Sequence, residues 1–488
     1  MHSVHLELIR AWNYSDVRSL PHLASFSGRR LIAATALLCI GVLSGCAGGA
    51  QPGPTALPLR PTATASFETE DLQQLMQQMV DEGAPAVLVE VRDGDEVWTH
   101  AEGVRSVRSD APAQATDHAR IASLTKPMLA TIVLQLVDAG EFRLDDRIEK
   151  YLPGIADGRD VTIEQLLDHT SGMPDFVETL AAGDPLAVPD TLKSGKSAEE
   201  IVDLAMKNPW LDEPGEAFHY SNTNYVVLTM LVEKITKQPV AEVLRERITE
   251  PLELKETSIP DGPAMPEPYL HGYWIDGGLS VDVSEQDTSL WTGAGGVVST
   301  VSDVNTFMRG LMTGKLLSPE LLGYMLRLNG EGYGLGVQGR GAKCAASHDI
   351  LMPVEAPIAT GVGASGSEDA TAAAKAVDSD DVNAEQDANR DENDFATHPG
   401  TTTLPTVPEK GSGSLVEHDG LDHIQIGQAG MVYGHLGSGL GYRALTMTSA
   451  DGLRQVTVFW NASPLDYMND PRMMTAFDLV DAALEVGC

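Results

Sequence analysis

The tetrapeptide Ser123-Leu124-Thr125-Lys126 stands at the start of a long apolar stretch and decides how the rest of the sequence is interpreted. Apolar residues recur at helical spacing through residues 123–139 and Gly140 comes next as a stop signal, so this segment predicts a helix. A separation of three residues places Ser123 and Lys126 on one face of that helix, at its first turn. There the Ser hydroxyl lies beside backbone N–H groups that can stabilise a developing oxyanion.

These two side chains have the chemistry of an activated nucleophile. A Lys that is shielded from water loses its proton more readily than a Lys in solvent, and it can then activate a neighbouring Ser. Taken alone, the tetrapeptide is a weak signal, because a solvated helix start carries the same residue types. Its interpretation therefore depends on motifs further along the chain.

Two further motifs favour the catalytic interpretation. Tyr220-Ser221-Asn222 lies where a loop enters an apolar helix, and a Tyr phenol near a cationic Lys can act as a general base. The Asn222 amide can hold both the Lys and a substrate carbonyl. The run of residues 434–439, Gly-His-Leu-Gly-Ser-Gly, precedes a C-terminal strand, and Gly437 would let a substrate approach the backbone closely. The alternatives are a buried Tyr bonded to a turn and an ordinary glycine-rich start of a hairpin.

In this order and spacing, the three motifs resemble those of the serine β-lactamase and penicillin-binding family. The likeness is greatest to the branch with class C β-lactamases, D-alanyl-D-alanine carboxypeptidases, D-aminopeptidases and related esterases. It covers about residues 68–340 and 430–485. Four further stretches support it: Leu166-Leu167-Asp168-His169-Thr170-Ser171-Gly172-Met173, Pro251-Leu252, Ala294-Gly295-Gly296-Val297-Val298-Ser299-Thr300 and Tyr333-Gly334-Leu335-Gly336.

The resemblance implies a role for each motif residue. Ser123 would be acylated, Lys126 and Tyr220 would move its proton to the leaving group, and Asn222 would contact the substrate. The backbone N–H groups of Ser123 and Ser438 would form the oxyanion hole. This chemistry needs no metal and no cofactor.

The third motif favours one substrate class at His435 and departs from the usual family sequence at Leu436. His435 stands where β-lactamases usually have Lys and carboxypeptidase-like members often have His, which favours D-amino-acid peptides as substrates over antibiotics. Leu436 stands where the family commonly has Thr or Ser to bind the terminal carboxylate of the substrate. Because Leu cannot donate that hydrogen bond, we expect esters or amides without a free carboxylate to be better substrates than in the rest of the branch.

Periodicity along the chain predicts the fold class. A helix is expected from about residue 68, a β-hairpin at residues 86–91 and 96–103, and a capped helix after Thr162. Further helices are predicted at residues 225–235, 240–248, 301–311 and 474–484, and strands at 442–449 and 454–461. Strands at both ends predict an α/β fold of the α+β type: a central antiparallel sheet of N- and C-terminal strands, flanked by helices, with an inserted mostly helical lobe.

The N-terminus has the composition of an export signal. Arg29-Arg30 precede a small, apolar run at residues 31–45, which is shorter than the about 20 residues of a membrane-spanning helix. Leu43-Ser44-Gly45-Cys46 resembles the lipobox of bacterial lipoproteins, which implies cleavage before Cys46 and lipidation of its thiol. An ordinary signal peptide or a short anchor helix is the alternative. We therefore predict a signal peptide at residues 1–45 and a Pro- and Thr-rich tether at residues 46–66.

The remaining residues, 67–488, are predicted to form one hydrolase domain with an insert. Residues 356–414 are acidic and almost free of aromatic side chains, which predicts disorder, and they lack the Asp and Gly spacing of a calcium loop. Export would leave Cys344 and Cys488 as the unmodified thiols, and they are expected to pair, with two unrelated thiols as the alternative. The formal net charge of −37 excludes nucleic acid as a partner.

Together these observations predict a lipid-anchored serine hydrolase on the extracytoplasmic face of a bacterial membrane. The expected chemistry is that of a D-alanyl-D-alanine carboxypeptidase, with peptidoglycan stem peptides as substrates. An esterase or a β-lactamase on the same scaffold is one alternative, and a catalytically idle binder of peptidoglycan or β-lactams is another.

Overall fold

A computed structural model describes residues 69–181, 191–276, 279–342, 430–464 and 470–485. Several predictions lie outside these residues and stay predictions: the signal peptide at 1–45, the tether at 46–66, the disorder of the insert at 356–414, lipidation of Cys46, and a disulfide between Cys344 and Cys488. No helix in the described ranges is both long enough and apolar enough to cross a membrane.

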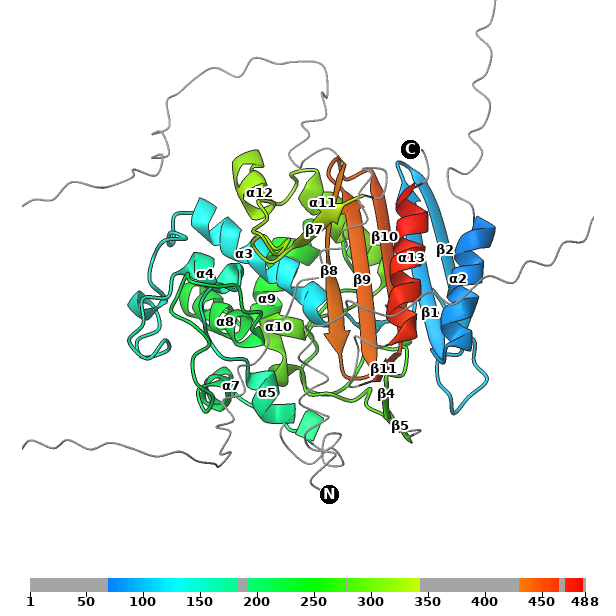
Figure 1. The fold of residues 1–488 in the computed structure, drawn as a ribbon, viewed down its shortest axis with the longest axis horizontal. Coiled ribbons are helices and arrows are strands. Elements are labelled where there is room, and N and C mark those ends of the chain that lie inside the picture. Colours follow the sequence, from blue (N-terminus) through cyan, green and yellow to red (C-terminus); the bar gives the residue numbers. More distant parts are fainter. Residues whose placement is uncertain (1–68, 182–190, 277–278, 343–429, 465–469, 486–488) are drawn as a thin grey trace, which may run out of the picture. The chain divides into compact units, whose positions relative to one another are not determined.

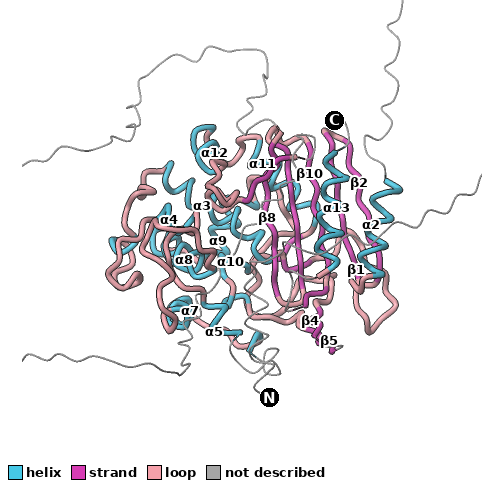
Figure 2. Tube along the Cα trace, in the orientation of Figure 1, coloured by secondary structure: helices cyan, strands magenta, loops and turns pink. Residues whose placement is uncertain are grey.

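The centre of the fold is a six-stranded antiparallel sheet (Figures 1 and 2) with the strand order β2-β1-β10-β9-β8-β7. The N-terminal hairpin pairs with the C-terminal strands through β1 and β10, in a register that places Val89 opposite Val458. The predicted sheet of N- and C-terminal strands is therefore confirmed. Its strands are β1 (Ala86–Asp93), β2 (Glu96–Gly103), β7 (Gln338–Gly341), β8 (Met431–Gly439), β9 (Tyr442–Ser449) and β10 (Arg454–Trp460).

Two helices from opposite ends of the chain cover one face of this sheet (Figure 1): α2 (Thr69–Asp81) and α13 (Pro471–Glu485). Leu72, Met76 and Met79 of α2 are buried, as their helical spacing predicts. They join a cluster with alternate strand residues such as Val89 and Val458, since every second side chain of a strand points to the same face. We call this cluster the outer core.

The other face of the sheet packs against the inserted helical lobe and α11 (Val301–Met312), and Figure 2 shows helices on both sides of the strands. The lobe is built around α3 (Thr125–Asp138) and α8 (Asn222–Thr236), whose side chains are mostly buried. Its other helices are α4 (Ile163–Leu167), α5 (Phe176–Ala181), α7 (Ala198–Ala205), α9 (Val240–Leu244), α10 (Thr292–Gly295) and α12 (Pro319–Met325). The capping box predicted at Thr162 is present at the start of α4.

Some elements differ from the predicted ones. The helix expected at residues 240–248 divides into α9 and a π-helical turn, η4 (Arg245–Thr249). Two small sheets were not predicted, because their strands are too short for a clear alternation of polar and apolar residues. They consist of β11-β4-β5 and β3-β6, with β3 (Ala119–Arg120), β4 (Tyr273–Asp276), β5 (Leu279–Asp282), β6 (Val298–Ser299) and β11 (Ala462–Pro464). Short 3-10 turns complete the described chain: η1 (Ala122–Leu124), η2 (Ile148–Lys150) and η5 (Thr288–Leu290).

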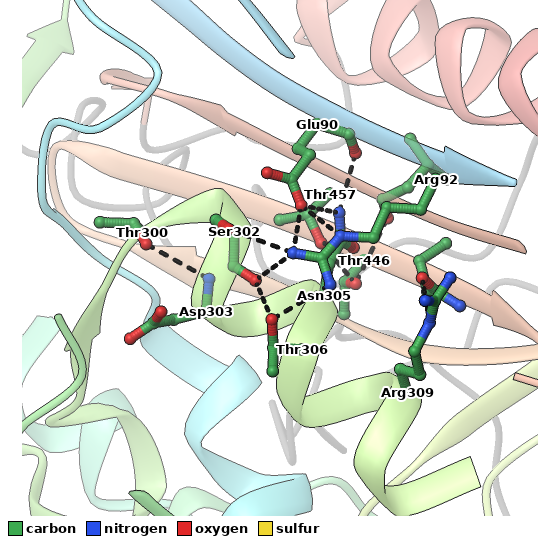
Figure 3. Close-up of polar contacts among 12 residues, drawn as sticks. Glu90, Arg92, Thr300, Ser302, Asp303, Asn305, Thr306, Arg309, Thr446 and Thr457 are labelled. Carbon is green, nitrogen blue, oxygen red and sulfur yellow. Dashed lines mark hydrogen bonds and ion pairs between the residues drawn. The ribbon is translucent and has the colours of Figure 1, made fainter. Parts of the chain in front are cut away.

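A buried polar network fastens α11 to the sheet (Figure 3). Asn305 of α11 donates from Nδ2 to the backbone oxygen of Glu90 at 3.0 Å and to its Oε1 at 3.2 Å. Its Oδ1 accepts from the hydroxyl of Thr457 at 2.7 Å, and Thr457 lies 2.7 Å from the hydroxyl of Thr446. Glu90 also pairs with Arg92 at 2.6 Å. We call these residues the α11 network.

Three members of the α11 network, Glu90, Thr457 and Thr446, lie in a single cross-strand row that ends at the third motif. Glu90 lies opposite Thr457, Thr457 opposite Thr446, and Thr446 opposite His435. Residues that lie opposite each other in a sheet project from the same face. The row therefore brings His435 to the face that holds α11 and the helical lobe.

Candidate active site

Ser123 lies on the 3-10 turn η1, directly before α3, and its residue surface is 9% exposed. The prediction that Ser123 occupies the first turn of the α-helix is wrong, because α3 begins at Thr125 and Ser123 lies in the 3-10 turn before it. The preceding Ala122 has a φ of 47°, a left-handed conformation that is strained for a residue with a side chain. The turn nevertheless keeps Ser123 and Lys126 together, as the spacing predicts.

The Lys126 side chain is fully buried, with 0% exposure, and its ammonium group has three acceptors around it. Nζ donates to Ser123 Oγ at 3.0 Å, to Asn222 Oδ1 at 2.8 Å and to the carbonyl oxygen of Ala294 at 2.9 Å. A Lys ammonium carries three N–H groups, so each has one partner. The structure thereby holds Lys126 against the Ser123 hydroxyl.

Tyr220 approaches the same hydroxyl from the loop that leads into α8. Its phenol oxygen lies 3.0 Å from Ser123 Oγ, and its ring centre lies 4.9 Å from Lys126 Nζ. Ser123 Oγ is thus within hydrogen-bond distance of two groups that can exchange a proton with it. This is the arrangement in which a Ser hydroxyl becomes a nucleophile.

Asn222, the first residue of α8, is oriented by a carboxyl group that sequence reasoning missed. Its Nδ2 donates to Asp175 Oδ2 at 2.8 Å, which turns its Oδ1 toward Lys126. An amide nitrogen carries two N–H groups, so one of them remains for a substrate carbonyl. Burial raises the pKa of Asp175 above its ordinary value, although hydrogen bonds from the Val177 backbone and Asn222 oppose the shift.

The third motif forms the strand β8 itself, whereas we predicted a glycine-rich run before a strand. His435 and Gly437 lie on the face toward η1 and the helical lobe. A side chain at Gly437 would collide with the backbone oxygen of Ile121 and approach Leu124. The absence of a side chain at Gly437 therefore serves the packing of β8 against the nucleophile turn, and a close approach of the substrate at this glycine stays a prediction.

Leu436 points away from Ser123. Its side chain is partly buried against the outer core, on the sheet face that α2 and α13 cover. Its backbone N–H donates to Gln338 Oε1 at 3.0 Å. The expectation that the side chain at this position faces the substrate is therefore wrong, because alternation along β8 turns it to the opposite face. Ser438, whose N–H is expected in the oxyanion hole, is solvent-exposed.

His435 is buried, with 1% exposure, and lies among aromatic side chains. Its Nε2 lies 3.0 Å from the Tyr333 hydroxyl, and its Nδ1 lies 2.7 Å from the backbone oxygen of Leu436. Burial, with a smaller effect of the nearby Lys126, lowers the pKa of His435 to about 3. His435 is therefore a neutral imidazole at physiological pH.

Sequence reasoning missed five groups around the predicted residues. His169, Ala294 and Tyr333 stand in stretches that carry the family resemblance, so a signal for them existed, but no role was assigned. Asp175 and Gln338 had no such signal. Among the described residues, no three His, Cys, Asp or Glu side chains lie close enough together to hold a metal ion.

Comparisons with known proteins identify the family of this chain. Residues 72–473 match the family described as Beta-lactamase. Penicillin-binding protein 4* of Bacillus subtilis is 32% identical over 191 residues, which are 38% of this chain and 40% of that protein. A putative D-alanyl-D-alanine carboxypeptidase of Escherichia coli is 32% identical over 217 residues, 40% of this chain and 48% of that protein. The chain thus spans less than half the length of these curated relatives.

Solved structures resemble the chain over most of its length. A D-stereospecific amidohydrolase from Streptomyces sp. is 26% identical with a TM-score of 0.60, covering 84% of this chain and 98% of that one. A D-amino acid amidase from Ochrobactrum anthropi SV3 is 22% identical with a TM-score of 0.60, covering 86% and 97%, and shares the fold. The match to the family over most of its sequence shows that the chain belongs to the Beta-lactamase family.

Proposed function

We propose that the protein hydrolyses the amide bond after a D-amino-acid residue through an acyl-enzyme on Ser123, with the chemistry of a D-alanyl-D-alanine carboxypeptidase. The observation that carries this proposal is the contact of one hydroxyl with two proton-transfer groups. Ser123 Oγ lies 3.0 Å from Lys126 Nζ and 3.0 Å from the phenol oxygen of Tyr220.

The reaction has two halves that use the same groups. Ser123 Oγ attacks the carbonyl carbon of the scissile bond while its proton passes to the Lys126 and Tyr220 pair, in which the cation of Lys126 favours the phenolate form of Tyr220 as the acceptor. The backbone N–H groups of Ser123 and Ser438 stabilise the negative charge on the carbonyl oxygen. The bond to the leaving group breaks as that group takes up the proton. Water then attacks the acyl-enzyme, the released acid departs, and Ser123 regains its proton.

We further propose that the enzyme works on the extracytoplasmic face of a bacterial cell membrane, held there by a lipid on Cys46. Its substrates would be stem peptides of peptidoglycan. The lipobox-like Leu43-Ser44-Gly45-Cys46 supports the anchor. A putative D-alanyl-D-alanine carboxypeptidase among the relatives supports the substrate. In cells that express the full chain, Cys46→Ser should lose incorporation of a fatty-acid label and leave the membrane fraction. Equal labelling of both proteins would refute the anchor.

A second candidate is the hydrolysis of esters or amides without a terminal carboxylate. The orientation of Leu436 toward the outer core favours it, because this position then gives a carboxylate no side-chain donor. A β-lactamase on the same scaffold receives no specific support from the third motif. An idle binder has less support still, since binding alone does not require Lys126 and Tyr220 against one hydroxyl.

Covalent labelling tests the acyl-enzyme directly. A fluorescent penicillin and a fluorophosphonate should each label the wild-type protein and fail to label Ser123→Ala. Absence of label on the wild type, or equal labelling of the variant, would overturn the mechanism. Turnover of a D-Ala-D-Ala peptide compared with a short-chain ester then separates the two candidate substrates.

A further inference from the structure

We propose that Tyr333 and His169 are positioning residues that keep His435 neutral with both ring nitrogens occupied, so that the leaving-group side of the site takes uncharged groups. The inference rests on the proposed acyl-enzyme and chooses between its two substrate candidates. Its basis is the direction of each hydrogen bond in a buried chain that runs from α8 to β8.

The direction is determined first at His169. Its Nδ1 lies 3.2 Å from the backbone N–H of Ser221, which only donates, so Nδ1 is an acceptor. Asn224 agrees with this assignment. Its Oδ1 accepts from the Ser171 hydroxyl at 2.6 Å, which turns its Nδ2 toward His169 Nδ1 at 3.1 Å. Since His169 is fully buried and burial lowers its pKa well below the ordinary value, the ring is neutral and its single proton is on Nε2.

The direction is determined independently at His435. Its Nδ1 lies 2.7 Å from the backbone oxygen of Leu436, which only accepts, so Nδ1 carries a proton. A second proton on Nε2 would make a buried imidazolium close to Lys126, and burial opposes this charge. Nε2 of His435 is therefore an acceptor.

Tyr333 joins the two rings. Its hydroxyl lies 3.2 Å from His169 Nε2, which donates, and 3.0 Å from His435 Nε2, which accepts. Tyr333 is fully buried and burial raises its pKa well above 10, so the phenol keeps the proton that it donates to His435. The chain runs in one direction, from the Ser221 N–H through His169 and Tyr333 to His435 and the Leu436 oxygen.

This direction leaves His435 no N–H for a substrate. The ring centre of His435 lies 6.3 Å from that of Tyr220, the group that would protonate the leaving group, so His435 borders the leaving-group side. There a carboxylate would receive no hydrogen bond from His435. It would receive none from Leu436 either, whose N–H is bound by Gln338 and whose side chain lies in the outer core. His435 and Leu436 therefore give a carboxylate no donor, and a desolvated carboxylate is costlier to leave without such bonds than a carboxamide or ester group.

A matched pair of substrates tests the specificity in the full-length enzyme. We compare an acyl-D-Ala-D-Ala peptide with the same peptide carrying a C-terminal carboxamide. The carboxamide should have the higher kcat/KM by at least about tenfold. An equal value, or a higher value for the free acid, would overturn the proposal. Failure of Ser123 to form an acyl-enzyme with either peptide would instead refute the proposed function, so the two failures are distinguishable.

Nitrogen NMR of the wild-type protein tests the positioning role without any substitution. At pH 7, His435 should show a protonated Nδ1 and an unprotonated Nε2, and His169 the reverse. A protonated Nε2 on His435 would overturn the assignment.

Two variants link this tautomer to specificity. His435→Lys places a cation at the position and should shift the ratio of kcat/KM values toward the free acid by at least about tenfold. Tyr333→Phe removes the donor to His435 Nε2, so this nitrogen should become protonated in part of the molecules and the preference for the carboxamide should fall. Tyr324→Phe is the matched control, because its hydroxyl binds Glu164 and should leave the ratio unchanged. An unchanged ratio in His435→Lys would contradict the proposal even if Tyr333→Phe does not fold.

Discussion

Two buried polar assemblies lie on the same face of the sheet, and their hydrogen-bond patterns differ. In the α11 network (Figure 3) the partners are complementary: Asn305 donates to Glu90 and accepts from Thr457, and Arg92 neutralises the Glu90 carboxylate. Around Ser123, whose residue surface is 9% exposed, two groups converge on a single oxygen. A satisfied network therefore stabilises the fold, whereas convergence of two proton-transfer groups on one hydroxyl prepares that hydroxyl for reaction.

The largest effect is expected from Lys126→Met, which removes a proton-transfer group from the reactive assembly. The acylation rate with a fluorescent penicillin should fall by at least about 1,000-fold, because Ser123 loses an orienting donor and Tyr220 loses the neighbouring cation that favours its deprotonated form. The melting temperature should change far less than the rate, since Met fills most of the same volume. If Lys126→Met acylates at the wild-type rate, the contact of Lys126 with Ser123 does not contribute to catalysis, and the proposed difference between the two assemblies is wrong.

The second effect is expected in the α11 network and should appear in stability. Asn305→Ala leaves the Thr457 hydroxyl and a Glu90 oxygen without this partner inside the protein. The free energy of unfolding should fall by about 2–4 kcal/mol in denaturant titrations. The kcat/KM of the folded fraction should stay within about twofold of the wild type.

Gln77→Ala provides the matched control for Asn305→Ala, because Gln77 makes an exposed contact with Asp81 and should cost less than about 0.5 kcal/mol. If Asn305→Ala instead lowers kcat/KM at unchanged stability, the α11 network belongs to the reactive assembly and the distinction fails.

The residues that lie together around Ser123 were predictable from the sequence because the proposed chemistry restricts their types. A Ser and a Lys three residues apart, with Tyr220 and Asn222 at a loop-to-helix junction, leave few other interpretations once they occur together. Asp175 was not predictable, since it acts through a hydrogen bond to Asn222 and any residue that accepts such a bond can serve. Its position depends on the path of the chain between α4 and α5, which no sequence pattern describes.

The third motif shows why the rest was missed. Its glycines have low strand propensity, so residues 434–439 were predicted to precede a strand rather than to form one. That single error reversed the interpretation of Leu436. Once the motif is a strand, alternation places His435 and Gly437 on one face and Leu436 on the other. The roles of His169 and Tyr333 depend on contacts between distant segments, which only the tertiary structure brings together.

A third effect concerns the pH dependence of stability, which arises from the buried, neutral His435. The pKa of His435 is lowered from 6.5 to about 3 by burial, with Lys126, Tyr220 and Tyr333 around it. Below pH 6.5 the unfolded chain binds a proton that the folded protein does not, so the free energy of unfolding falls as the pH drops toward 3. The contribution of one such group is at most about 1.4 kcal/mol per pH unit.

This effect is measured as the slope of unfolding free energy between pH 6.5 and 4.5 in the wild type and in His435→Gln. Gln does not titrate in this range, so the slope should decrease by the contribution of one proton. His169, whose pKa burial also lowers, keeps contributing with the same sign in the variant. Identical slopes would mean that His435 binds a proton equally in the folded and unfolded states.

The smallest effect is expected from Leu436→Thr, which restores the residue type common in the family. Because the side chain at this position packs in the outer core, the new hydroxyl should face α2 and α13 rather than Ser123. The change should cost about 1 kcal/mol of stability and alter the kcat/KM ratio of free acid to carboxamide by less than about threefold. His435→Lys, one residue earlier and on the opposite face, should alter the same ratio by at least about tenfold. A larger change of the ratio in Leu436→Thr than in His435→Lys would show that the substrate is recognised from the Leu436 side of β8, and the division between its two faces would fail.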